Sequence, residues 1–399
     1  MYPDFSYLFH DFFGSEIGNW ASIIKTFGFF LALAFIVAGI IVSAELKRKE
    51  DEGLLKPSKI KIVTGDPPTI KEIITNGLIG FVLGFKIPYV FLNFDEFKAD
   101  AARTLMSGKG TMIWGLVGAA AFAGYRYWEK KRNQLDKPKI TEQTVHPHER
   151  TGDLIIAAAI SGIVGAKIFA IIEPSYFKQF LQDPIGTFFS GSGLAVLGGL
   201  ILASIVVGWY AKKMGIPLFH VMDVAAPAIM IAYGIGRQGC HFSGDGDWGV
   251  ANQLDKPFSW LPDWLWAYHY PRNIAQECES VTFHQEILNE GCNFLETSYL
   301  ITPVWPTSVY ETILAFMLFG ILWALRKRIK VAGVLFFIYL MMNGMERFLI
   351  EFARINDRYS VLGMQLTQAQ MISILMTIIG ATAVYYLIKR HKADKPLIY

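Results

Sequence analysis

Apolar residues are concentrated in nine stretches of the chain, and most of these stretches are long enough to cross a lipid bilayer. About 20 apolar residues in a helix span the hydrocarbon core of a membrane. The second and third stretches are the shortest or are interrupted by Lys86 and Pro88. The pattern therefore predicts an all-α, polytopic transmembrane protein with about nine spans in one transmembrane domain, 1–399. The predicted spans are 21–43, 73–94, 111–127, 153–173, 187–210, 221–240, 306–325, 331–350 and 368–388.

Composition agrees with this pattern and narrows the function. Of the 399 residues 53% are apolar and only 18% are charged, whereas a soluble chain carries about 25% charged residues. The net charge of +3, without a basic tract that includes aromatic residues, argues against a nucleic-acid partner. The N-terminus is acidic and aromatic, so we expect no cleavable signal peptide and a first stretch that stays as a span.

Lysine and arginine in the loops predict the orientation of the spans. One set of alternate loops (44–72, 128–152, 211–220, 326–330 and 389–399) holds 23 of these residues, and the other set holds 8. Basic residues accumulate on the cytoplasmic side of membrane proteins. The bias predicts an N-terminus outside and a C-terminus in the cytoplasm.

One large outer loop, 241–304, follows from this topology. It is acidic, with 9 Asp or Glu residues against 2 Lys or Arg residues, and it holds Cys278 and Cys292. A disulfide between these cysteines would be permitted outside the cytoplasm, and two unpaired thiols are the equal alternative. No CxxC pair or His/Cys cluster indicates a metal site, so we expect no metal and no cofactor.

The segment 233–249 combines glycines with charges at the end of an apolar stretch. Gly236 and Gly239 allow close helix packing or an unwound helix end, and Gly249 belongs to a group of glycines that lets the backbone turn. Arg237 in this setting is a good anion receptor, because a guanidinium binds phosphate oxygens with two parallel donors. A packing seam with a snorkelling arginine is the alternative. Asp245-Gly-Asp247 resembles the start of a calcium loop, but the remaining ligands are missing.

A second charged segment, 345–357, ends another apolar stretch. Arg347 and Glu351 are four residues apart and Arg354 is three further on, so all three fall on one helical face. We expect Glu351 to hold both arginines and to leave a net positive face. A purely structural ion-pair network is the alternative.

A helix start is predicted at Pro306, with Thr307 or Ser308 as a cap. Tyr310 and Glu311 then fall in its first turn. A plain helix start with an interfacial tyrosine is the alternative. A further glycine-rich segment, 190–200, is best explained by tight helix packing.

Considered together, these segments predict one site. Arg237, Arg347, Arg354 and Glu311 all fall at the outer membrane level on different spans. Charges at such depth are costly and normally face the protein interior. The sequence therefore predicts a positively charged site towards the outer leaflet, suited to an anionic lipid headgroup.

The same segments resemble the bacterial prolipoprotein diacylglyceryl transferase family. The resemblance rests on Gly236–Gly249, on Pro306–Glu311, on the Arg347/Glu351/Arg354 helix and on Gly363–Gln370, which occur in the family's order. It implies a seven-span enzyme of the bacterial cytoplasmic (inner) membrane, with its N-terminus outside and its C-terminus inside. The two extra spans are explained by a helical hairpin, 73–127, inserted into the first cytoplasmic loop, which preserves the orientation of everything downstream.

By resemblance, the enzyme moves a diacylglyceryl group from phosphatidylglycerol to the lipobox cysteine of a preprolipoprotein and releases glycerol phosphate. The resemblance implies that Arg237 binds the headgroup phosphate and that Arg347 binds or assists. Glu351 and Arg354 would orient Arg347, and Tyr310 would support the site together with Gly236, Gly239 and Gly249.

The chain departs from the family pattern at several positions. Cys240 stands where the family usually has Asn, Trp305 where it has His, and Leu197 where it has a functional His. Ser243-Gly244-Asp245, with one extra residue, replaces the family's usual Asn-Gly-Glu. The general base is therefore unassigned, and His241, Glu311 and Asp245 are candidates.

His241 is the candidate nearest in sequence to Arg237, and an imidazole has an unperturbed pKa of about 6.5. We predict that His241→Gln lowers the turnover number by about 10²-fold. Two alternatives to this enzyme remain: a membrane transporter with a broken, glycine-rich helix, and a non-catalytic relative that binds lipid at the same anion site.

Overall fold

The computed structural model describes most of the chain as helix. The described residues are 1–99, 104–105, 107–189, 195–274, 280–281, 286–287, 300, 302–361 and 363–393. Contacts within the chain divide it into two compact units. One unit comprises Met1–Arg48 and Ile216–Tyr399, and the other comprises Lys49–Gly215. The predicted cysteine pair, Cys278 and Cys292, lies outside the described residues.

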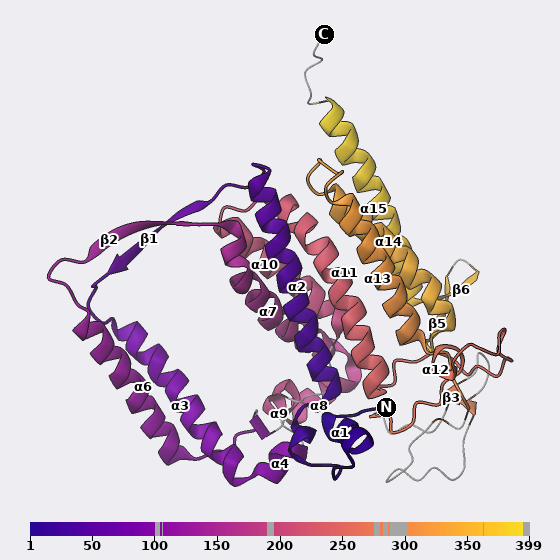
Figure 1. Cartoon of the computed structure of the whole chain (residues 1–399), viewed down its shortest axis with the longest axis horizontal. Helices are drawn as coiled ribbons and strands as arrows, with labels where there is room; N and C mark the ends of the chain where they lie inside the picture. The colour runs from indigo at the N-terminus through magenta and orange to yellow at the C-terminus, as the bar shows by residue number, and fades with distance from the viewer. Residues whose placement is uncertain are drawn as a thin grey trace. The chain divides into compact units, whose positions relative to one another are not determined.

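Each predicted span coincides with a helix (Figure 1). Within the described residues, seven segments are long and apolar enough to cross a membrane, and they include all of these helices except α6 and α14. The polytopic membrane fold is thus confirmed, and the count of nine spans stays a prediction. The long helices are α2 (Thr26–Asp51), α3 (Ile70–Leu92), α6 (Met112–Arg132), α7 (Thr151–Ile172), α10 (Val196–Lys213), α11 (Leu218–Ser243), α13 (Thr307–Leu325), α14 (Val334–Ile350) and α15 (Gln368–Ala393).

Shorter elements join these helices. The helical ones are α1 (Phe5–Phe13), η1 (Trp20–Ile23), α4 (Phe94–Ala99), η2 (Pro147–Arg150), α8 (Pro174–Gln182), α9 (Pro184–Phe189), α12 (Asp263–Trp266) and η3 (Glu351–Ala353). The strands are β1 (Ser58–Thr64), β2 (Lys139–Val145), β3 (Ser280–Val281), β4 (Glu286–Ile287), β5 (Arg358–Val361) and β6 (Met364–Thr367).

The strands correct the all-α prediction, because they pair into three two-stranded sheets in the described residues. β1 and β2 pair antiparallel, from Ser58 opposite Val145 to Thr64 opposite Lys139. Their loops, 44–72 and 128–152, look in the sequence like charged connectors. The strands are mostly exposed, so no buried face imposes the apolar alternation by which a strand is recognised, although β-branched residues recur in both.

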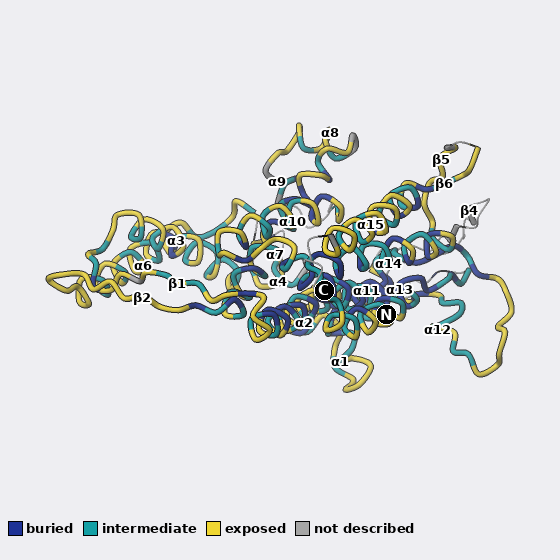
Figure 2. The backbone as a smooth tube through the Cα atoms, turned by 90° about the horizontal axis from the view of Figure 1, so that it is seen from above, coloured by how far each residue is buried: buried dark blue, intermediate teal, exposed yellow. Residues whose placement is uncertain are grey.

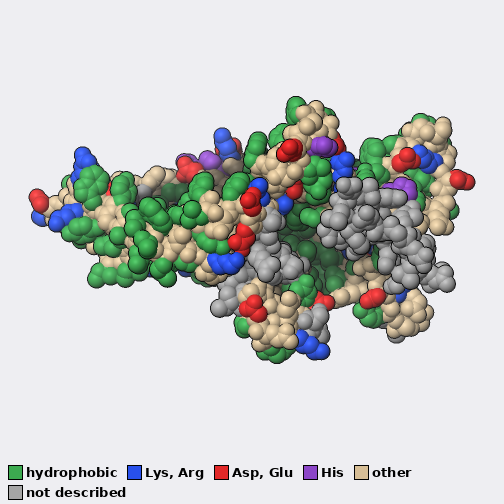
Figure 3. All heavy atoms as spheres, turned by 90° about the horizontal axis from the view of Figure 1, so that it is seen from below, with side chains coloured by type: hydrophobic (Ala, Val, Ile, Leu, Met, Phe, Trp, Pro, Cys, Tyr) green, Lys and Arg blue, Asp and Glu red, His purple; other side chains and the backbone are tan. Residues whose placement is uncertain are grey.

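Within the unit Lys49–Gly215, α3 and α6 pack against each other through glycines. A Cβ on Gly80 would lie 2.2 Å from the carbonyl oxygen of Gly118, and a Cβ on Gly84 would lie 2.1 Å from that of Trp114. Backbones this close require the absence of side chains. The outward faces carry exposed apolar residues such as Leu78, and Figure 3 shows hydrophobic side chains over the visible side of this hairpin.

Helices α7 and α10 of this unit use the same kind of contact. Gly165 faces Gly198, and a Cβ on Gly199 would lie 2.8 Å from the carbonyl oxygen of Gly162. This contact agrees with the packing interpretation of the glycine-rich segment 190–200, although 190–194 lie outside the described residues.

In the other unit, α11 is the most buried helix, with 50% of its span window buried against 11% for α3. Figure 2 shows this burial along α11 and α13. The core between α11, α13 and α14 consists of buried apolar residues: Ala226, Met230, Ala315, Leu322, Leu335 and Tyr339. The buried Asp223 carboxylate of α11 accepts hydrogen bonds from the N–H groups of Gly333 (2.9 Å) and Phe336 (3.2 Å) at the start of α14. These two hydrogen bonds tie the first part of α11 to the start of α14.

Helix α15 begins with reciprocal capping. Gln370 N–H donates to the Thr367 hydroxyl and Thr367 N–H donates to the Gln370 side chain, each at 3.1 Å. This pair satisfies two backbone donors that a helix start leaves free. Gly344 of α14 packs closely on α15, since a Cβ there would lie 2.7 Å from the Thr377 hydroxyl.

Candidate functional site

The end of α11 is shaped by two glycines in the left-handed region. Gly244 (φ 66°) follows the last helical residue and donates its N–H to the carbonyl oxygen of Cys240. Gly246 (φ 91°) turns the chain again. L-residues with a side chain rarely adopt such angles. Since α11 continues without a break to Ser243, the alternative of an unwound helix end is wrong, and the turn lies just beyond the helix.

The turn places Asp247 against the start of α13. The hydroxyls of Thr307 (3.1 Å) and Ser308 (2.9 Å) donate to the Asp247 carbonyl oxygen. The Asp247 N–H in turn donates to the Asp245 carboxylate at 3.2 Å. The prediction that Thr307 or Ser308 caps α13 is therefore wrong, because both hydroxyls bind the glycine-rich loop instead; α13 has no side-chain cap at Pro306.

Gly249 brings three segments of the chain together. Its N–H donates to the Trp305 carbonyl oxygen at 2.8 Å, and a Cβ at this position would lie 2.4 Å from the carbonyl oxygen of Ala353. Val250 N–H donates to the same Ala353 oxygen at 2.9 Å. The glycine is required by this close approach, which joins the end of α11, the start of α13 and the segment after α14.

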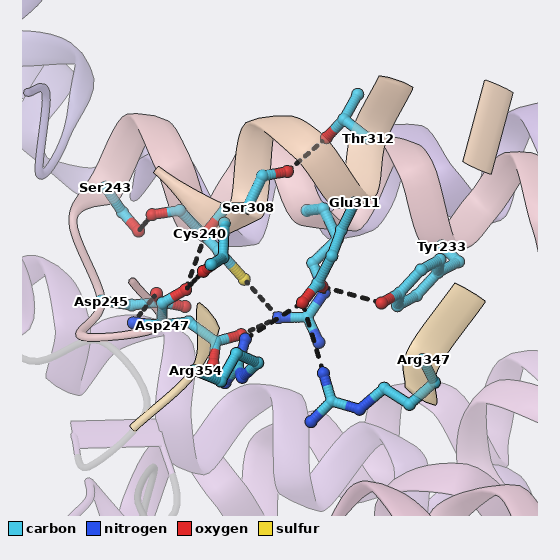
Figure 4. Close-up of polar contacts among 12 residues, drawn as sticks. Tyr233, Cys240, Ser243, Asp245, Asp247, Ser308, Glu311, Thr312, Arg347 and Arg354 are labelled. Carbon is cyan, nitrogen blue, oxygen red and sulfur yellow. Dashed lines mark hydrogen bonds and ion pairs between the residues drawn. The ribbon is translucent and has the colours of Figure 1, made fainter. Parts of the chain in front are cut away.

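Glu311 is the centre of the site. Its carboxylate is completely buried and forms ion pairs with Arg237, with Arg347 (3.2 Å) and with Arg354 (3.2 Å). It also accepts a hydrogen bond from the Tyr233 hydroxyl at 2.7 Å. Figure 4 shows the side chains of Tyr233 of α11, Arg347 of α14 and Arg354, which follows α14, converging on Glu311 of α13. A buried carboxylate is tolerated because cations and hydrogen-bond donors surround it.

Asp247 is the second carboxylate of the site. One of its oxygens pairs with Arg237 and the other with Arg354. Its side chain is 26% exposed, whereas the carboxylates of Glu311 and Glu351 are fully buried. Asp247 is therefore the most accessible of the three acids.

Glu351 holds one arginine and not two. It pairs with Arg347 at 3.0 Å and accepts a hydrogen bond from Asn356 at 2.5 Å. Arg354 binds Glu311 and Asp247 instead. The prediction that three residues share one helical face fails because α14 ends at Ile350, and Arg354 is extended (φ −92°, ψ 158°) after a short 3₁₀ turn.

Cys240 and His241 follow Arg237 on α11, but they face different neighbours. The Cys240 sulfur lies 3.9 Å from the Arg237 guanidinium, as the helical spacing predicts. The His241 imidazole is buried, with Nδ1 3.2 Å from the Tyr270 hydroxyl and its ring against Tyr268. Burial raises the pKa of Tyr270 well above its ordinary value, so this phenol stays protonated.

The predicted supporting residues Tyr310, Gly239 and Gly236 have different surroundings. The Tyr310 hydroxyl donates to the Leu265 carbonyl oxygen at 2.7 Å and so ties α13 to the loop after α11. Gly239 approaches Phe30, with 3.0 Å between a Cβ and that side chain, whereas Gly236 faces open space.

A pocket of about 480 Å³ has Ala353 in its wall. Its other walls are Ala251, Asn252, Gln253, Leu254, Trp305, Leu349 and Phe352. Most of these walls are apolar, and Ala353 is the residue before Arg354 in the chain. Among the described residues no cluster of His, Cys, Asp or Glu could hold a metal ion.

Three residues of this region did not stand out in the sequence. Tyr233 lies one helical turn before Arg237, and this spacing predicts that the two side chains are neighbours. Asp247 is considered in the sequence only as part of a segment that resembles a calcium loop. Glu346 of α14 is 5% exposed, and neither carboxylate oxygen has a hydrogen-bond partner in the described part of the chain. An acid inside an apolar run is itself a signal.

Comparison with known proteins assigns the family. A family model described as prolipoprotein diacylglyceryl transferase matches residues 113–386. The phosphatidylglycerol–prolipoprotein diacylglyceryl transferase of Streptococcus equi subsp. equi is 30% identical over 243 residues, which are 60% of this chain and 78% of the relative. The enzyme of the same name from Dehalococcoides mccartyi is 28% identical over 314 residues, 76% of this chain and 98% of the relative.

The matched region contains every arginine and carboxylate described above, and it covers well over half of the chain. The resemblance seen in the sequence is thus confirmed, and the chain belongs to the prolipoprotein diacylglyceryl transferase family.

Proposed function

We propose that this protein transfers the diacylglyceryl group of phosphatidylglycerol to the lipobox cysteine of preprolipoproteins, the first step of bacterial lipoprotein lipidation. The observation that supports this most strongly is the convergence of Arg237, Arg347 and Arg354 on the buried Glu311. A membrane protein retains so many buried charges where they act on an anionic ligand. The family's substrates carry such an anion in the lipid phosphate.

The reaction explains why arginines are needed. The bond between the glyceryl carbon and a phosphate oxygen breaks, a carbon–sulfur bond forms, and the thiol loses its proton. The products are a thioether and glycerol phosphate. The leaving phosphate gains charge, which preplaced guanidiniums stabilise in a site of low dielectric constant. The attacking thiolate is also scarce in water near neutrality, because a free cysteine has a pKa of about 8.5.

The contacts suggest a division of labour among the residues. Arg237 and Arg347 bind the headgroup phosphate and stabilise its growing charge. Glu311 acts as a positioning residue, since four donors occupy its carboxylate. Glu351 orients Arg347. His241 stays the candidate base.

The site lies towards the outer leaflet of the bacterial cytoplasmic membrane in this proposal. The five loops that together hold 23 of the basic residues are cytoplasmic, so the end of α11, the start of α13 and the end of α14 lie towards the opposite surface. The α3–α6 hairpin is an insertion that leaves and returns on the cytoplasmic side. Nine spans then give an outer N-terminus and an inner C-terminus.

One experiment tests the activity. The purified protein is incubated with phosphatidylglycerol and a lipobox peptide, and the thioether product is followed by mass spectrometry. A peptide with serine in place of the cysteine is the control. Formation of product only with the cysteine peptide supports the proposal, whereas lipid binding without product identifies a non-catalytic relative, for which Leu197 in place of the family's usual histidine is the best argument.

A further inference from the structure

The carboxylate of Asp247 has the geometry of a bound phosphate. Its two oxygens point to different cations, one to Arg237 and the other to Arg354. A phosphodiester presents two non-bridging oxygens that share one negative charge, and guanidiniums bind both kinds of anion through the same paired donors. Asp247 thus occupies a position that fits an anion with two oxygens.

Arg237 and Arg354 are held in place without Asp247. The Arg237 guanidinium also pairs with Glu311 and lies 5.1 Å from the centre of the Tyr233 ring. Arg354 also pairs with Glu311, at 3.2 Å. The two cations therefore keep their spacing when the Asp247 side chain leaves, and the same pair of donors becomes available to another anion.

Asp247 is also the acid that can leave. Its side chain is 26% exposed, whereas Glu311 is fully buried. Its main chain is fixed, because its carbonyl oxygen accepts from Thr307 and Ser308 and its N–H donates to Asp245. Only the short side chain has to turn, and staggered rotamers of a partly exposed side chain interconvert readily.

We propose that Asp247 occupies the phosphate subsite between Arg237 and Arg354, and that the headgroup phosphate of the lipid binds by displacing it. This inference rests on the proposed function and deepens it, since it assigns the headgroup phosphate to Arg354 together with Arg237. Arg347, which is held by Glu311 and Glu351, then lies beside the subsite and stabilises the charge that develops on the leaving oxygen.

Exchange of one anion for another has a consequence for selectivity. When Asp247 turns away, Glu311 is the one acid of the described residues left paired with both Arg237 and Arg354, and such incomplete neutralisation is unfavourable in a site of low dielectric constant. A neutral lipid such as diacylglycerol therefore cannot displace Asp247, whereas a phosphodiester can. The subsite selects anionic phosphate by competition with an internal carboxylate.

The test measures equilibrium binding of phosphatidylglycerol to the full-length protein in an uncharged detergent, without acceptor peptide. Asp247→Asn removes the competing charge and keeps the size of the side chain, so we expect roughly tenfold tighter binding. Asp247→Glu keeps the charge and should bind no tighter than the wild type. Asp255→Asn, which removes an exposed acid of the same loop, is the matched control and should leave affinity unchanged.

Weaker or unchanged binding by Asp247→Asn overturns the inference, because the acid would then position the arginines and would not compete with the lipid. Size-exclusion chromatography in detergent establishes that each variant is folded before binding is measured; if Asp247→Asn is misfolded, Asp247→Ser takes its place with the same expectation. Diacylglycerol should bind equally weakly to all variants, and selective tightening towards it also overturns the inference. Because the assay needs no transfer, it stands apart from the proposed function: absence of thioether in the transfer assay refutes only the latter.

Discussion

The α3–α6 hairpin and the α11–α13–α14 bundle are both built from long apolar helices, yet they bury different kinds of residue. The hairpin is joined by backbone contact at Gly80 and Gly118. Its charged residues, such as Arg126 and Glu72, are about 30% exposed and pair near the helix ends. The bundle instead encloses Glu311, fully buried among arginines.

The contrast between glycine contacts in the hairpin and buried charges in the bundle distinguishes residues that only pack helices from residues that bind a ligand. A charge in the middle of a bilayer costs about 3 kcal/mol even by the lowest scales, and glycine contacts provide helix association without it. The hairpin shows that helices of this chain can pack through glycine contacts, without buried charges. The retained charges of the bundle therefore indicate ligand chemistry, and substitutions in the two regions should affect different measurements.

The largest effect is expected at Arg237. Arg237→Ala should reduce transfer by more than about 10³-fold, because it removes a preplaced donor from the developing phosphate charge. Arg237→Lys should also be poor, since an ammonium lacks the paired donors of a guanidinium. The measurement is thioether formation, with membrane insertion as the control. Near-normal activity in Arg237→Ala would remove this residue from the headgroup site.

The next largest effect is expected at His241, whose imidazole contacts Tyr268 and Tyr270. If His241 is the general base, His241→Gln should lower the turnover number by about 10²-fold with little change in lipid binding. The pH–rate profile is the diagnostic measurement, because loss of the base removes its acidic limb. A variant that keeps this limb shows that His241 only packs against Tyr268 and Tyr270.

The hairpin should respond in stability and not in activity. Gly80→Leu places a side chain where a Cβ would already lie 2.2 Å from the Gly118 carbonyl oxygen, so we expect a loss of about 1–3 kcal/mol in the free energy of unfolding. Gly124→Leu on α6 is the matched control, since a Cβ there meets nothing within 4 Å. Thermal unfolding in detergent measures both. A larger loss of transfer than of stability in Gly80→Leu would give the hairpin a catalytic role.

The smallest effect is expected at Glu346, a buried acid without a hydrogen-bond partner in the described residues. Such a carboxyl is least costly when it is neutral. Glu346→Gln keeps its shape without the charge, so stability should change by less than about 1 kcal/mol and transfer by less than about threefold. Glu351→Gln on the same segment is the comparison and should be worse, because it weakens the hold on Arg347. A large loss in Glu346→Gln would show that Glu346 works as an ion.

The sequence by itself was sufficient to predict the helices, the family and most of the residues that form the site. Apolar runs of about 20 residues are a local signal, which is why each predicted span overlaps a helix, although α10 begins at Val196 where the prediction began at 187. The segments with Arg237, Glu311 and Arg347 were likewise readable, because charges at the ends of apolar runs are rare and have few explanations.

Only the tertiary structure decided which charges meet. Spacing along a helix predicts that Glu351 pairs with Arg347 and Arg354. Such spacing identifies only residues that are neighbours within about one helical turn. The helix ends before Arg354, which reaches Glu311 and Asp247 instead. These partners are separated by 43 and 107 residues in the chain. Ion pairs at such separations depend on where helices end and how their glycines let loops approach, and no local pattern encodes that geometry.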